Sequence, residues 1–280
     1  MLSLQLFEVG YCRHLEYISL SGGALRAISF PSISALIVHP REGAILYDTG
    51  YADHFMDATA SLPERLYRWL TPVTLPSSQR LSVQLARAGL TVSDIRYCVI
   101  SHFHGDHIAG LRDLDRALFI ASRLDVEQLY SCSRFGGLLK GLLPALLPPD
   151  FASRLRVAES YPVRPPRDGW SGLGEAHDLF GDGSVLALRL PGHAPGHLGL
   201  FLRDAEDRPV LLCGDACWSR RAWQEYRLPS LLTRSVIHDW NAYKATLSKL
   251  HVLGERERDL IILPSHCGES LRAYSQRTPV

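Results

Sequence analysis

Short apolar runs separated by glycine, proline and serine recur along the 280-residue chain. Runs of this kind, rich in leucine, isoleucine and valine, predict β-strands. Helical spacing of apolar residues predicts helices between them. Strands are expected at 3–9, 14–20, 33–39, 44–48, 95–100, 117–121, 153–158, 184–190, from His197, at 209–213 and at 260–263. Helices are expected at 78–89, from a histidine-rich loop to about Arg116, at 123–131 and at 239–253, with 51–77 irregular or in short helices.

One stretch, from Phe135 to Phe151, fits neither pattern. It is rich in leucine but interrupted by glycine and proline, and it lacks the polar face of an amphipathic helix. A core helix is one interpretation. The functional interpretation is a lid that lines an apolar substrate pocket with Phe135, Leu138 and Leu142. Contact with a membrane surface is a weaker option, because Lys140 is the only positive charge in the stretch.

Composition narrows the class of protein. Hydrophobic residues make up 46% of the chain and charged residues 21%, as in a soluble globular protein. A formal net charge of +1 gives no electrostatic reason to expect nucleic acid as a partner. No segment approaches the roughly 20 apolar residues of a membrane span. The N-terminus lacks the pattern of a signal peptide, and the six cysteines form no CxxC pair, so a reduced, cytoplasmic protein is expected.

Residues that could bind metal are concentrated in Ser101–Gly110, directly after the strand predicted at 95–100. His102, His104, Asp106 and His107 lie within six residues there, and Asp106 is expected to cap a following helix. Imidazole and carboxylate are the ligands that zinc, iron and manganese take from proteins. His104 and His107 should lie on different sides of the turn, which indicates two adjacent metal positions. A surface histidine cluster that binds metal incidentally fits the sequence less well, because later parts of the chain supply the remaining ligands of a metal site.

The same order of apolar strand, turn and ligand recurs later in the chain. It presents His193 after 190, Asp215 after 213 and His266 after 263. Asp48 also ends a strand, either to orient a ligand histidine or only to close its turn. His197 is interpreted as structural rather than as an eighth ligand. Three cysteines lie within two residues of these ligands and are interpreted as buried fillers, with oxidation sensitivity as the alternative: Cys213, Cys217 and Cys267.

Taken in order, the motifs HxHxDH, PGHxPGH, GDA and SH resemble the metallo-β-lactamase superfamily. The resemblance spans about residues 33–267. It implies an αββα sandwich of two mixed β-sheets with helices on the outer faces. On this interpretation residues 1–280 form a single domain, with 123–151 as a candidate lid insertion.

The resemblance also implies roles for the ligands. His102, His104 and His193 would bind one metal ion, and Asp106, His107 and His266 the other, with Asp215 bridging them. Two divalent metal ions are expected. Zinc is the metal expected, and iron or manganese are the alternatives. A hydroxide bridging the ions would attack a lactone or ester carbonyl, and Asp106 would shuttle the proton.

Within the superfamily the chain is most similar to the lactonase-like branch that opens N-acyl homoserine lactones. Flavodiiron proteins carry Glu where His104 stands, and true β-lactamases usually lack the carboxylate at Asp215. Lactonases carry Tyr three residues after that carboxylate, whereas this chain has Trp218. The expected substrate is a small ester or lactone with a hydrophobic group, beside an apolar wall at Trp218. Thioesterase activity or a mononuclear iron sulfur dioxygenase are the alternatives, and a homodimer is one option for the assembly.

Overall fold

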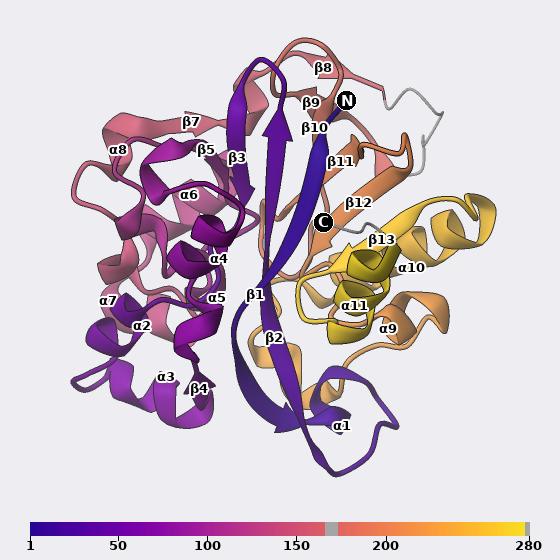
Figure 1. Cartoon of the computed structure of the whole chain (residues 1–280). Helices are drawn as coiled ribbons and strands as arrows, with labels where there is room; N and C mark the ends of the chain where they lie inside the picture. The colour runs from indigo at the N-terminus through magenta and orange to yellow at the C-terminus, as the bar shows by residue number, and fades with distance from the viewer. Residues whose placement is uncertain (166–172, 278–280) are drawn as a thin grey trace.

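The computed structural model describes residues 1–165 and 173–277. Two mixed β-sheets pack face to face between two layers of helices (Figure 1). Helices α2 to α8 cover one sheet and α9 to α11 lie against the other (Figure 1). The predicted αββα sandwich is confirmed.

The first sheet has seven strands in the order β4-β1-β2-β3-β5-β6-β7. The pairs made by β1, β2, β3 and β4 with one another are antiparallel, and β3, β5, β6 and β7 run parallel to one another. The strands are β1 (Ser3–Leu15), β2 (Ala27–His39), β3 (Gly43–Tyr47), β4 (Val73–Thr74), β5 (Ile95–Val99), β6 (Leu118–Ala121) and β7 (Leu155–Val157).

The second sheet has six strands in the order β13-β12-β11-β10-β9-β8. Only β12 and β13 pair in parallel, and the other neighbours are antiparallel. The strands are β8 (Val163–Arg164), β9 (Ala176–Asp178), β10 (Val185–Arg189), β11 (Leu198–Arg203), β12 (Pro209–Gly214) and β13 (Ile261–Pro264).

The helices are mostly short. The α-helices are α1 (Glu16–Ser19), α2 (Asp53–Ala58), α3 (Glu64–Leu70), α4 (Leu81–Arg87), α5 (Gly105–Ile108), α6 (Arg123–Ser131), α7 (Arg134–Leu139), α8 (Phe151–Arg154), α9 (Arg220–Gln224), α10 (Trp240–Arg256) and α11 (Gly268–Arg277). The 3-10 helices are η1 (Ser77–Gln79), η2 (Val92–Asp94), η3 (Leu111–Asp113), η4 (Pro144–Leu146), η5 (Ala158–Ser160) and η7 (Leu231–Ser235). In the described part of the chain, no helix is both long and apolar enough to cross a membrane.

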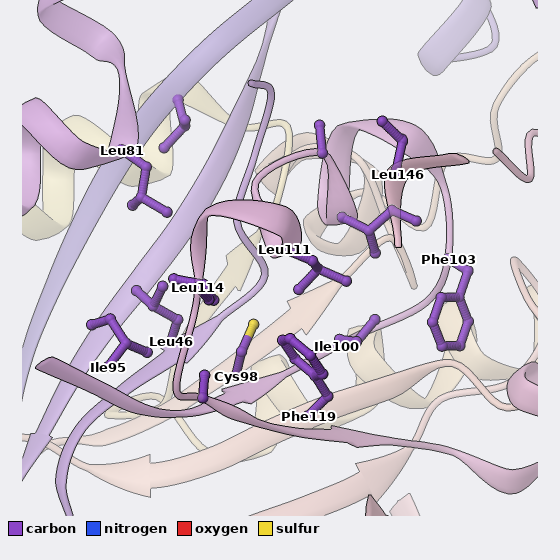
Figure 2. Packing of buried hydrophobic residues seen from close by; sticks show 14 of the residues in the cluster. Leu46, Leu81, Ile95, Cys98, Ile100, Phe103, Leu111, Leu114, Phe119 and Leu146 are labelled. Carbon is purple, nitrogen blue, oxygen red and sulfur yellow. The ribbon is translucent and has the colours of Figure 1, made fainter. Parts of the chain in front are cut away.

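Strand β3 illustrates how the layers are held together. Ala44 and Leu46 point into the core beneath the first helical layer, and Ile45 and Tyr47 point into the core between the sheets. Because side chains alternate along a strand, a strand buried on both faces must be apolar throughout. Figure 2 shows the first of these cores, where Leu46 lies near Cys98 and Leu111.

Several predicted elements differ from the structure. Residues 14–20 are not a strand: β1 ends at Leu15, and α1 and a turn lead into β2, which begins earlier than predicted. The helix after the histidine loop ends at Ile108 instead of running to Arg116. Asp106 is not its N-cap; α5 begins after His104 without any side-chain cap, and the Asp106 carboxylate faces His107 and His266 instead.

The stretch from 135 to 151 is not one core helix. It forms the end of α7, an isolated bridge between Leu142 and His104, and η4. Residues 153–158, predicted as a strand, begin within α8 and reach β7 only at Leu155. Helices α9 and α11 were not predicted, and 51–77 does form short helices.

Candidate metal centre

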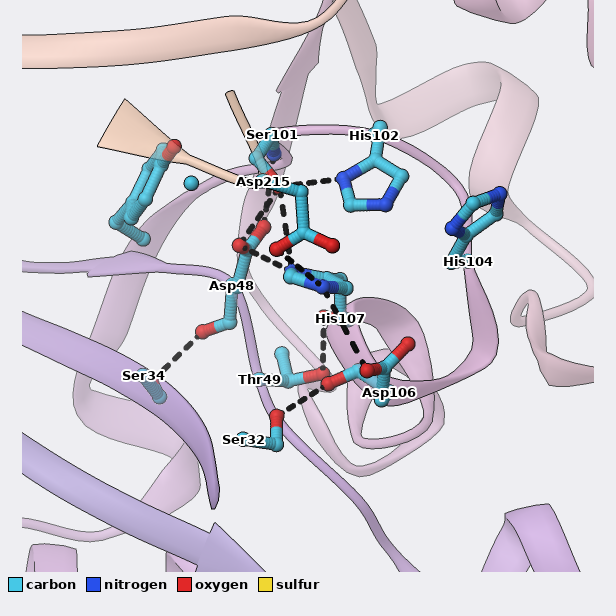
Figure 3. A network of polar contacts seen from close by, with 12 residues as sticks. Ser32, Ser34, Asp48, Thr49, Ser101, His102, His104, Asp106, His107 and Asp215 are labelled. Carbon is cyan, nitrogen blue, oxygen red and sulfur yellow. Dashed lines mark hydrogen bonds and ion pairs between the residues drawn. The ribbon is translucent and has the colours of Figure 1, made fainter. Parts of the chain in front are cut away.

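Four strand ends converge on one edge of the sandwich. β5 leads to the loop that carries His102 and His104 and then to α5; β10, β12 and β13 lead to His193, Asp215 and His266. The structure brings all seven predicted ligands together, and within the described residues they form overlapping clusters of three potential ligands. Figure 3 shows Asp215 between His102 and His107.

The first cluster consists of three imidazoles. His193 Nε2 lies 3.1 Å from His102 Nε2 and 3.0 Å from His104 Nδ1. Zinc–nitrogen bonds of about 2.0–2.1 Å in tetrahedral geometry place ligand nitrogens roughly 3.3 Å apart. The three nitrogens therefore surround a point suited to one metal ion.

The second cluster consists of Asp106, His107 and His266. Asp106 Oδ2 lies 3.7 Å from His107 Nε2 and 3.5 Å from His266 Nε2. Asp215 lies between the two clusters, because its Oδ1 is 3.1 Å from His266 Nε2 and its Oδ2 is 3.2 Å from His193 Nε2. Oδ2 is also 3.2 Å from His266 Nε2, so this one carboxylate contacts both clusters.

Unsatisfied buried atoms indicate that these residues fit metal ions. His107 Nε2 and Asp215 Oδ1 are buried without a hydrogen-bond partner in the described structure. Burial holds the pKa of His102 and His193 well below the usual value, so both rings are neutral, the form that binds metal. Burial alone would lower the pKa of His107. The negative charges of the surrounding carboxylates, of which Asp106 has the largest effect, raise it to about 10. The centre therefore attracts a cation.

A second set of contacts holds the ligand rings. Asp48 Oδ2 accepts a hydrogen bond from His107 Nδ1 at 2.7 Å, and Ser101 donates to Asp48 from its backbone N and its Oγ (Figure 3). Ser101 Oγ also lies 2.9 Å from His102 Nδ1. His266 Nδ1 donates to the carbonyl oxygen of Pro31 at 2.7 Å. Each of these three rings thus presents its other nitrogen to the centre.

Two further residues contact Asp215. Burial lowers the pKa of His197 to about 3, and its neutral Nε2 accepts a hydrogen bond from the Asp215 backbone N at 2.9 Å. This contact agrees with a structural interpretation of His197. Trp218 Nε1 donates to Asp215 Oδ2 at 2.9 Å, and its ring packs edge-on against His193.

A cavity of about 140 Å³ opens beside the first cluster. Apolar side chains form part of its wall, and polar side chains form the rest. Its lining comprises His102, Phe103, His104, Asp125, Gln128, Lys140, Leu142, His193, Ala194, Ser235, Val236, Ile237 and His238. Leu142 also borders a second hollow of about 470 Å³ that extends under α7 to Glu64 and Pro144.

The residues predicted to line a substrate pocket lie in different environments. Leu142 borders the cavity, Leu138 packs against the core beneath the first helical layer, and Phe135 is 60% exposed. Trp218 touches the centre itself, not this cavity.

Sequence reasoning missed the residues that complete the site. Ser101 was named only as the first residue of the histidine loop and was given no role. Asp125 and Gln128 belong to the helix predicted at 123–131, and residues 235–238 have no recognised pattern. A serine followed three residues later by aspartate, Ser122 and Asp125, was the only available signal, and it is usually a local helix cap.

Fold and site together define a class: an αββα sandwich whose clustered His and Asp side chains are consistent with a dinuclear metal centre. The model of the metallo-beta-lactamase superfamily matches residues 29–266. The chain belongs to this superfamily.

Several relatives are lactonases. The N-acyl homoserine lactonase AttM of Rhizobium radiobacter is 29% identical over 157 residues, which is 55% of this chain and 53% of AttM, so this match spans about half of the relative. AiiB of Agrobacterium fabrum, also an N-acyl homoserine lactonase, is 25% identical over 253 residues, 90% of this chain and 85% of AiiB. A mutant of B. thuringiensis AiiA with N-decanoyl-L-homoserine bound at its active site has a similar fold, with a TM-score of 0.71, 19% identity, and coverage of 96% of this chain and 95% of AiiA.

Proposed function

We propose that this chain is a dinuclear metal-dependent hydrolase that opens a lactone or cleaves another carboxylic ester with a hydrophobic group. The observation that carries the proposal is the position of Asp215 between two clusters of three candidate ligands, with its carboxylate 3.2 Å from His193 Nε2 and 3.1 Å from His266 Nε2. Two divalent ions bound there would supply an activated water and a Lewis acid for the substrate carbonyl. Zinc suits the imidazole-rich ligand set, and iron or manganese are alternatives.

The outer contacts have a defined role in this proposal. Asp48 accepts the His107 Nδ1 proton, which leaves Nε2 as the ligand atom. Asp106, with 14% of its side chain exposed, is the most solvent-accessible carboxylate of the centre. We assign it the transfer of a proton to the leaving alkoxide, since a second oxygen remains available when one is a ligand.

The cavity supports the choice of substrate. Phe103, Leu142, Val236 and Ile237 give it an apolar wall beside the first cluster. Leu142 lines both this cavity and the hollow under α7, whose lining is mainly apolar. A substrate chain that lies against Leu142 would gain about 0.8 kcal/mol of binding free energy for each methylene it buries. The stretch 123–151 would then act partly as core and partly as a lid.

A hydrolysis screen with the metal-loaded protein tests the proposal. N-acyl homoserine lactones, other lactones, aryl esters and thioesters of matched chain length would be compared, with the ion content measured in the same samples. Hydrolysis of lactones or oxygen esters, lost with a chelator and restored by zinc, is expected. A protein that holds two ions but cleaves only thioesters would refute the ester specificity, and a single iron per chain would refute the dinuclear centre.

A matched pair of histidine variants gives the control. His104→Ala removes a ligand and should abolish hydrolysis. His54→Ala removes an imidazole that pairs with Asp113 on the surface, so it should leave hydrolysis unchanged.

A further inference from the structure

We infer that Asp125 is a positioning residue that holds the turn carrying His193 in place for metal binding. The inference rests on the proposed metal centre but on no particular substrate. Asp125 is 3% exposed and belongs to the first turn of α6, far in sequence from every ligand. Its Oδ1 accepts a hydrogen bond from the backbone N of Gly196 at 2.7 Å, and Gly196 lies three residues after His193.

The start of α6 is built so that Asp125 is free for this contact. Ser122 and Asp125 have the spacing of a capping box, in which the two side chains would bond to each other's backbone. Neither bond forms. Ser122 Oγ donates instead to Glu159, whose other oxygen accepts the backbone N–H of Arg123. Glu159 thus replaces the local cap, and the Asp125 carboxylate turns to Gly196.

Gly196 fits against the beginning of α6 only because it has no side chain. A Cβ atom there would lie 2.0 Å from Ser122 Oγ and 3.1 Å from the Asp125 backbone N. The second glycine of the PGHAPGH motif therefore allows the close approach that Asp125 needs.

The other side of the same turn is also held. His238 N donates to the carbonyl oxygen of His193 at 3.1 Å, and Asp239 N donates to that of Gly192 at 2.9 Å. Gln128, one helical turn after Asp125, lies 3.3 Å from His238 Nδ1. The turn is thus clamped between α6 and the start of α10. Without Asp125, the contacts on the side of α10, from His238, Asp239 and Thr246, would remain, but the hydrogen bond that holds Gly196 to α6 would be lost.

The prediction is specific to one metal position. Loss of Asp125 should weaken the ion held by His102, His104 and His193, whereas the ion held by Asp106, His107 and His266 should be little affected. Partners that orient ligands typically contribute 10–100-fold to metal affinity. Because Asp125 acts through the backbone, we expect about tenfold.

Zinc titration of the metal-free full-length chain, in competition with a chelator of known affinity, tests the inference. Asp125→Ala should weaken one of two binding steps about tenfold and leave the other unchanged. Asp125→Asn should recover most of the affinity, because its amide oxygen can still accept from Gly196. Glu127→Ala, which removes an exposed carboxylate from the same helix, should match the parent. Hydrogen exchange of the Gly196 amide in the metal-free protein should speed up only in the alanine variant.

Equal affinity in parent and Asp125→Ala would overturn the inference. So would an equal loss in both binding steps, which would show that Asp125 supports only the fold. If Asp125→Ala does not fold, Asp125→Ser, whose hydroxyl is too short to reach Gly196, should give the same split. A parent chain that binds no zinc would instead refute the metal centre of the proposed function, and the hydrogen-exchange comparison would still decide whether Asp125 holds the turn.

Discussion

Replacing Asp48 with asparagine removes one charge and almost no volume beneath His107. Asp48 is 1% exposed, and its carboxylate accepts bonds from His107 Nδ1 and from Ser101. Its backbone has a φ of +58°, a left-handed conformation that asparagine tolerates as well as aspartate. Asp48→Asn therefore changes the partner of the ligand ring and leaves the turn intact.

The expected loss follows from that one contact. A hydrogen bond to a charged group contributes about 1.5–3 kcal/mol, and each 1.4 kcal/mol changes an affinity about tenfold. Metal affinity at the Asp106, His107 and His266 position should therefore fall by roughly 10–100-fold, as is typical for partners of ligand histidines. The melting temperature of the metal-free protein should change little.

Chelator competition combined with thermal melting of the metal-free chain gives both quantities. Asp207→Asn is the matched control, because Asp207 also has a left-handed backbone, with φ of +60°, but lies in an exposed turn. If Asp48→Asn keeps the parent's metal affinity and loses thermal stability, Asp48 only closes its turn and the reasoning is wrong.

Three further predictions concern neighbouring groups. Trp218→Phe should keep the edge-on packing against His193 but lose the indole donor to Asp215, lowering metal affinity by up to about tenfold in the same chelator assay; unchanged affinity would show that the bond contributes nothing. Leu142→Ala should join the cavity to the hollow under α7 and shift the optimum of a chain-length series to longer acyl groups. The gain in kcat/KM should be up to about fourfold per methylene. Leu139→Ala, at an exposed position, should leave the optimum unchanged. Burial raises the pKa of Asp125 to about 7, so the folded chain binds the carboxyl proton of Asp125 more tightly than the unfolded chain does. The folded state therefore loses stability as the pH rises from about 4 to 7. The melting temperature of metal-free Asp125→Asn should therefore rise relative to the parent across that range, and a constant difference would contradict the shift.

The convergence of the candidate ligands could be predicted because the local pattern and the tertiary arrangement agree. His193, Asp215 and His266 each follow an apolar strand, and strands of one sandwich bring their ends to a common edge. The order of motifs then predicted the fold itself, including its two mixed sheets.

Predictions failed where a side chain had a distant partner. Asp106 was expected to cap its helix, yet its carboxylate faces His266. No role was predicted for Asp125, whose spacing from Ser122 is that of a local capping box, and it reaches across to Gly196. A local pattern cannot distinguish these outcomes, because the competing partner lies far away in the sequence.

The leucine-rich stretch was ambiguous for a different reason. Leu143 and Leu146 are buried in the core, Leu142 borders the cavity, and Phe135 and Leu139 are exposed. Its short segments change direction at glycine and proline, so no single periodicity describes it.

The metal content of the purified chain tests the central claim most directly. The parent and three variants, His104→Ala, His266→Ala and His54→Ala, would be loaded with zinc, dialysed against a weak chelator and analysed by elemental mass spectrometry. We predict close to two ions per chain in the parent and in His54→Ala, and about one in each of the other two variants. Two ions retained in both ligand variants, or one or none in the parent, would contradict a dinuclear centre built from these residues.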